Sequence, residues 1–240
     1  MDIMYMFYHP GLDSEEIIMS EEESRHCVSV LRMKAGDVLN IIDGKGHSAN
    51  AVILDANKNA CRLKVGTISS HLQTRPYQLH LAISPVKNSE RIDWFLEKAA
   101  ECGIDEISFI ESRHAERVKV NMERCQRVLI SAIKQSRQFY LPVLHPIQPL
   151  SDWLKRPTGN SEMKFMAWCK ADAGNLLKNK LHKKEIKRIC ICIGPEGDFD
   201  ETEVKMATDA GFELLSLGDA ILRTETAALY CCMALKALYS

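Results

Sequence analysis

The sequence of 240 residues lacks the features that mark secreted, membrane-spanning and metal-thiolate proteins. No apolar run approaches the ~20 residues that a membrane-spanning helix requires, so we expect no membrane segment. The first five residues, MDIMY, do not combine a basic segment with a following apolar one, which predicts no signal peptide. The nine cysteines are odd in number and form no C-x-x-C pair. Together these absences predict a reduced, cytoplasmic protein without a metal site.

The common glycine-rich nucleotide motifs are also missing. No predicted strand is followed by G-x-G-x-x-G, and there is no phosphate-binding loop, so conventional dinucleotide binding is disfavoured. Composition excludes little more, since hydrophobic residues make up 46% and charged residues 26% of the chain, as in ordinary globular proteins. The length allows one large domain or two modest ones.

Charge is distributed unevenly, although the net charge is only −1. Between Arg113 and Arg137, seven Lys or Arg (113, 117, 119, 124, 127, 134 and 137) face two acids, Glu116 and Glu123. Such a stretch is either a solvated helix face or a surface that contacts phosphates of a nucleic acid. The charge pattern alone leaves both interpretations open.

Two different patterns divide the chain. Residues 1–72 contain short apolar or alternating runs separated by turn residues, which predict a compact β-barrel with one short helix over 21–31. Residues 73–76 form the predicted linker. From residue 77 onward strands and helices alternate, which predicts an α/β domain with a parallel sheet over 77–240. The predicted strands of this domain are 79–84, 107–110, 163–168, 189–193 and 214–217.

Two blocks near the C-terminus each combine a buried strand, a glycine turn and a helix start. The first is Gly194-Pro195-Glu196-Gly197, directly after the strand 189–193, and the second spans Leu217 to Ala227. Open α/β sheets bind ligands at such strand ends, and glycine lets a ligand approach the backbone closely. These blocks therefore mark the candidate site.

The paired blocks resemble the signature of the ribosomal RNA small-subunit methyltransferase E family, within the SPOUT class of methyltransferases. Further likeness comes from His26–Arg32, from Glu97–Ile104 and from Gln135–Arg137. The resemblance implies a trefoil-knotted SPOUT methyltransferase domain preceded by a PUA-like barrel, and a homodimer. It also implies S-adenosylmethionine as methyl donor, and methylation of N3 of a uridine in the decoding region of 16S rRNA within the small ribosomal subunit.

The resemblance also implies roles for individual residues. Arg223 and Glu225 are the expected catalytic residues, because uridine N3 must lose a proton and a base or a cation can assist. The residues expected to contact RNA phosphates are Arg32, Lys34, Arg113 and Arg137. The expected cofactor-binding residues are Gly194, Pro195, Glu196, Gly197, Leu217, Gly218, Leu222, Thr224, Thr226 and Ala227.

Two positions depart from the family pattern, and two other functions stay open. Lys134 stands where the family usually has Glu, and Asp198 replaces a common third glycine. The alternatives are another SPOUT enzyme that methylates ribose 2′-OH, and a non-catalytic RNA-binding factor of ribosome assembly. The first usually carries an N-x-G-x-x-R motif where this chain has Glu101–Ile104, and the second would not need an intact Arg223–Thr226.

Overall fold

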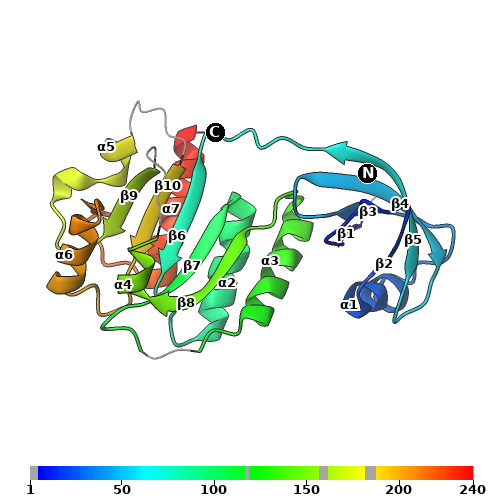
Figure 1. The fold of residues 1–240 in the computed structure, drawn as a ribbon, viewed down its shortest axis with the longest axis horizontal. Coiled ribbons are helices and arrows are strands. Elements are labelled where there is room, and N and C mark those ends of the chain that lie inside the picture. Colours follow the sequence, from blue (N-terminus) through cyan, green and yellow to red (C-terminus); the bar gives the residue numbers. More distant parts are fainter. Residues whose placement is uncertain (1–4, 117–118, 157–161, 182–187, 240) are drawn as a thin grey trace. The chain divides into compact units, whose positions relative to one another are not determined.

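A computed structural model describes residues 5–116, 119–156, 162–181 and 188–239 (Figure 1). The chain forms two compact units, Met1–Thr74 with Ile130–Leu141, and Arg75–Leu129 with Pro142–Ser240. The domain bounds proposed from the sequence, 1–72 and 77–240, remain a prediction. None of the described helices is long and apolar enough to cross a membrane.

The first unit is built on a five-stranded sheet. Alternating residues of its longest strands point inward, as Ala49, Ala51 and Ile53 do, and they pack against Phe7 and Leu63 in one apolar core. Neighbouring strands pair antiparallel except β1 and β3, which are parallel. The strand order is β1 (Met6–Tyr8), β3 (Val38–Ile42), β4 (His47–Asp55), β5 (Arg62–Ser70) and β2 (Glu16–Ile18).

The helix predicted over 21–31 changes type midway. Ser20 caps α1 (Glu21–Arg25) by accepting a hydrogen bond from the Glu23 backbone N–H, and the chain then continues as a π-helical turn, η1 (His26–Val30). The predicted short helix is therefore confirmed over 21–30, with its second half in the π-helical form. Wide π turns often occur at functional sites, and this one ends at Val30, two residues before Arg32, whose φ is +56°.

The second unit contains the predicted parallel sheet, with six strands. All its neighbouring pairs are parallel, and the β10 side chains are buried because both faces of the sheet are covered. The strand order is β11 (Glu213–Leu215), β9 (Glu162–Ala167), β10 (Arg188–Ile193), β6 (Gln78–Ile83), β7 (Glu106–Glu111) and β8 (Val143–Pro149).

Helices cover both faces of this sheet (Figure 1). Helices α2 (Ser89–Cys102) and α7 (Thr224–Tyr239) pack together, and α7 lies on β6 and β10. The other face packs against α4 (Leu150–Trp153) and α6 (Glu201–Asp209). The remaining helices are α3 (Met122–Ser136), α5 (Leu177–Leu181) and the short 3₁₀ turn η2 (Ala173–Asn175).

Local signals in the sequence mark several element ends in the second unit, but one strand of its sheet was not predicted. Gly103 ends α2 with a φ of +85°. Asp200 and Glu203 form a complete capping box at the start of α6, in which each side chain accepts a hydrogen bond from the backbone N–H of the other residue. Strand β8 was not predicted, because it contains two prolines, which cannot donate to a ladder. It lies at the edge of the sheet, where proline is tolerated.

Candidate functional site

A pocket lies at the C-terminal ends of three neighbouring strands, β9, β10 and β11. It encloses about 530 Å³ of space, part of it open to solvent. The loops after these strands and the first turn of α7 form its walls. The lining residues are Ala167, Trp168, Cys169, Ile193, Gly194, Pro195, Asp198, Ser216, Leu217, Gly218, Ala220, Leu222, Thr224 and Ala227.

The structure brings most of the predicted cofactor-binding residues together in this pocket. Those that line it are Gly194, Pro195, Leu217, Gly218, Leu222, Thr224 and Ala227. Three others do not line it. Glu196 and Gly197 are exposed on the outer part of their turn, and Thr226 lines a separate hollow.

Sequence reasoning missed one whole wall of the pocket. Ala167 is the last residue of β9, and Trp168 and Cys169 follow it. Strand β9 neighbours β10 in the sheet although 20 residues separate the two strands in the chain. The apolar run 163–168 signalled a strand whose end would share an edge with the others, but nothing in the sequence indicated that it lies next to β10. The other missed residues, Ile193, Asp198, Ser216 and Ala220, flank or lie within the two blocks.

A hydrogen bond joins the two blocks directly. The Thr224 hydroxyl, at the start of α7, donates to the Gly194 carbonyl oxygen at 3.0 Å. A side chain at Gly194 would meet the Phe199 ring at 3.1 Å, so glycine permits this close approach. At Gly218 the space is open, but its φ of +114° favours glycine. The site therefore exposes main chain where a Cβ would either clash or strain the backbone.

Asp198 connects the turn after β10 to the loop after β9. Its φ is +59°, which explains why a glycine is common at this position. One carboxylate oxygen accepts a hydrogen bond from the Cys169 backbone N–H at 3.0 Å, and the other accepts from the Phe199 N–H at 2.8 Å. The departure from the family pattern thus adds a side-chain link between two walls of the pocket.

The first turn of α7 separates the pocket from a second hollow. Thr224 and Ala227 line the pocket, whereas Glu225 and Thr226 line the hollow, together with Asn88, Glu90, Arg91 and Trp94 of the α2 region. The Glu225 carboxylate is buried, its Oε2 has no hydrogen-bond partner among the described residues, and Arg91 Nε lies 3.8 Å from Oε1. Arg223 is exposed just before this turn, and its side chain makes no hydrogen bond or ion pair with any described residue.

Several cations of the basic stretch between Arg113 and Arg137 form ion pairs with acidic residues of the protein. Arg113 pairs with Asp200 at 2.6 Å and Arg124 pairs with Asp93 at 2.5 Å. Hydrogen bonds from Thr202 and Glu203, together with Arg113, hold the pKa of the Asp200 carboxyl below its usual value. Arg117 lies outside the described residues. Several cations of the stretch therefore already have partners within the protein.

The other predicted RNA-contacting residues are exposed and belong to the first unit. Arg32, Lys34 and Arg137 lie on its surface. Arg32 and Arg137 both have a φ of +56°, in the left-handed region that few side chains adopt. Such strain is most often retained where the residue has a function.

Lys134, the second departure from the family pattern, has a partner in the same unit. Its ammonium bonds to the Glu23 carboxylate, and both side chains are largely buried. Lysine therefore neutralises a buried acid at this position.

Comparisons with known proteins agree with this architecture. Residues 73–236 match the model of an RNA methyltransferase domain, and residues 20–66 match that of an RNA methyltransferase PUA domain. The ribosomal RNA small subunit methyltransferase E of Buchnera aphidicola is 28% identical over 98% of this chain and 93% of its own length.

Two solved structures have the same fold over nearly the whole chain. A probable rRNA methyltransferase from Porphyromonas gingivalis is 36% identical, covers 99% of this chain and 100% of its own, and has a TM-score of 0.87. A ribosomal RNA small subunit methyltransferase E from Neisseria gonorrhoeae, bound to S-adenosyl methionine, is 28% identical over 98% of both chains, with a TM-score of 0.84. The chain belongs to the RNA methyltransferase family, with a PUA domain and a methyltransferase domain arranged along the sequence as in the ribosomal RNA small subunit methyltransferases E.

Proposed function

We propose that this protein transfers a methyl group from S-adenosylmethionine to N3 of one uridine in the decoding region of 16S rRNA. The observation that carries the proposal is the pocket at the ends of β9, β10 and β11, in a chain that belongs to the RNA methyltransferase family. The N. gonorrhoeae relative, with a TM-score of 0.84, was solved with S-adenosyl methionine bound.

The residues of the pocket fit this cofactor. An adenine needs backbone donors and acceptors, and the turns at Gly194 and Gly218 leave main chain uncovered. Trp168, Leu217 and Leu222 supply apolar surface. When bound, S-adenosylmethionine supplies a methyl group on a sulfonium, which is ready for in-line transfer.

We assign the deprotonation of the acceptor base and the stabilisation of its charge to Glu225 and Arg223, at the first turn of α7. Uridine N3 is protonated at neutral pH and is a weak nucleophile until the proton leaves. Glu225 is suited to take the proton because its Oε2 has no partner among the described residues, and exposed Arg223 is suited to stabilise the negative charge on the base. Trp94, which is 43% exposed, offers a stacking surface for an unpaired base.

Phosphate groups of the RNA are assigned to Arg32, Lys34, Arg113 and Arg137. Arg113, whose side chain is exposed, would exchange its partner Asp200 for phosphate. From the family resemblance we further propose a trefoil knot in the methyltransferase domain, a homodimer, and a reaction on the small ribosomal subunit in the cytoplasm.

A mapping experiment tests the proposal. Labelled S-adenosylmethionine is supplied with unmodified small subunits and, separately, with naked 16S rRNA, and the labelled nucleotide is identified. We expect label on uridine N3. Label on a ribose would support a 2′-O enzyme instead, and no label despite calorimetric cofactor binding would support an assembly factor. For Glu225, the variant Glu225→Gln should lose most of its turnover while binding the cofactor normally, and normal turnover would exclude it as the base.

A further inference from the structure

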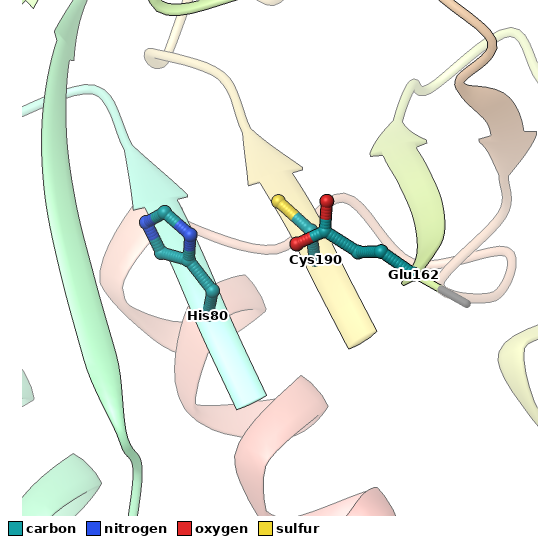
Figure 2. A group of neighbouring side chains, drawn as sticks. All are labelled: His80, Glu162 and Cys190. Carbon is teal, nitrogen blue, oxygen red and sulfur yellow. The ribbon is translucent and has the colours of Figure 1, made fainter. Parts of the chain in front are cut away.

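A buried polar cluster lies in the second unit, away from the pocket. His80 on β6, Cys190 on β10 and Glu162 on β9 extend from three adjacent strands toward one another (Figure 2). One ligand atom of each lies within 4.8 Å of the others. The side chains of His80 and Glu162 are 2% and 1% exposed, and Cys190 is fully buried. Cys190 precedes Gly194 by four residues, about 13 Å along an extended strand.

Two atoms of this cluster lack the partners that buried polar atoms normally have. His80 Nε2 lies 2.8 Å from the Ser108 hydroxyl oxygen, which leaves Nδ1 without a hydrogen bond. Glu162 Oε2 is also unpartnered among the described residues. Buried polar atoms in native proteins are nearly always bonded, and an exception calls for a specific explanation, such as an ion. Both atoms belong to groups that ligate metals.

We propose that His80, Glu162 and Cys190 bind a zinc-like divalent cation. A nitrogen, a thiolate sulfur and a carboxylate oxygen form a donor set that Zn²⁺ commonly takes. With bonds of about 2.0–2.3 Å, ligand atoms around a tetrahedral zinc lie roughly 3.3–3.8 Å apart. The side chains therefore need to approach by about 1 Å. Glu106 Oε2 lies 3.6 Å from His80 Nδ1 and accepts a hydrogen bond from Arg188 at 2.7 Å, so it would supply the fourth ligand by giving up that bond.

Two arginines pair with residues of this cluster: Arg188 Nε lies 3.3 Å from Glu162 Oε1, and Arg156 is the one that contacts the Cys190 sulfur. Its guanidinium nitrogen lies 2.8 Å from the sulfur of Cys190 and 3.4 Å from Glu162 Oε1. A divalent ion with a Cys190 thiolate brings a net charge of +1, the same as the guanidinium that it replaces. The charge balance with Glu106, Glu162 and Arg188 is therefore preserved. The Arg156 side chain is 18% exposed, so it lies at the margin of the cluster and can turn outward.

The bound ion would join β6, β10 and β9 below the pocket. The cysteine spacing gave no indication of such a site, because its three ligands come from three separate strands. Cobalt is a suitable probe, because thiolate coordination produces a charge-transfer band in the near ultraviolet. The titration uses the full-length chain carrying Cys169→Ala, which removes the exposed thiol.

Three variants in that background test the proposal. Cys192→Ala is the matched control, since Cys192 is equally buried on the same strand and face but lies outside the cluster. We expect one Co²⁺ per chain with a thiolate band in the parent and in the control, and loss of the band in Cys190→Ala. Arg156→Met should bind Co²⁺ at least tenfold more tightly, because the competing cation is gone.

Other results would overturn the proposal. The proposal is overturned by a parent protein without the band, by an equal band in Cys190→Ala, or by unchanged affinity in Arg156→Met. Added Zn²⁺ should also raise the melting temperature of the parent and of the control but not that of Cys190→Ala. Because neither readout involves methyl transfer, the result is independent of the proposed activity.

Discussion

The link that Asp198 makes between two walls of the pocket can be measured with three substitutions. Asp198→Ala removes both side-chain hydrogen bonds and keeps a non-glycine residue at a φ of +59°. Hydrogen bonds to a charged group contribute about 1.5–3 kcal/mol each when buried, and because this carboxylate is partly exposed we expect a combined loss of about 2 kcal/mol. Asp198→Gly loses the same bonds but recovers about 1 kcal/mol of left-handed backbone strain. Asp198→Asn tolerates the backbone and keeps one acceptor oxygen.

The stability order expected from these terms is wild type, Asn, Gly and then Ala, measured as the free energy of unfolding in urea. Without the link to Cys169, binding must order the two walls, so we expect the Kd for S-adenosylmethionine to rise about tenfold in the Ala and Gly variants, a cost of about 1.4 kcal/mol. Calorimetric titration measures it. The reasoning is refuted if the Ala variant binds the cofactor as tightly as wild type, or if Gly is less stable than Ala.

Three further substitutions test separate features. Lys134→Met leaves the Glu23 carboxylate, which is 6% exposed, without its cation, so the free energy of unfolding in urea should fall by about 3 kcal/mol. Adding Glu23→Gln should restore most of this stability, and a Lys134→Met variant as stable as wild type would contradict the reasoning. Arg137→Gly relieves the strain of a φ of +56° and should stabilise the fold by about 1 kcal/mol. It should also reduce, by about one, the slope of the logarithm of the 16S rRNA binding constant against the logarithm of salt concentration. An unchanged slope would exclude a phosphate contact. Gly218→Ala has open space for its Cβ, but the φ of +114° at this position strains an alanine by about 1–3 kcal/mol. We therefore expect calorimetry to show at least a fivefold loss of cofactor affinity, and normal affinity would show that this turn need not keep its conformation.

Local patterns in the sequence were sufficient to predict the parallel sheet and much of the pocket. Central strands of the second unit, such as β10 and β6, are buried on both faces and read as apolar runs. The turns at Gly194 and Gly218 follow β10 and β11. Parallel strands end at one edge, so the two glycine blocks could be expected to face the same side. The hydrogen bond from Thr224 to the Gly194 carbonyl joins them.

The order of strands in the sheet could not be predicted, because it depends on contacts between distant segments. Trp168 and Cys169 line the pocket because β9 pairs with β10, and no local pattern in the sequence indicates that pairing. For a similar reason the sequence could not show that the Glu225 side chain lines the second hollow and not the pocket. On the first turn of a helix, residues one position apart face different sides, and only the packing of α7 on α2 decides which side meets the pocket.

The position of β10 has a consequence for how the chain is made. During synthesis β6 and β9 leave the ribosome before β10, yet in the finished sheet β10 lies between them and pairs with both. Until residues 188–193 emerge, β6 therefore has one unpaired edge, and β9 has two because its other neighbour, β11, follows β10 in the chain. Unpaired edges attract other strands, so the half-made protein is more prone to aggregate than the finished one, and chaperones that shield such edges would be needed most in that interval.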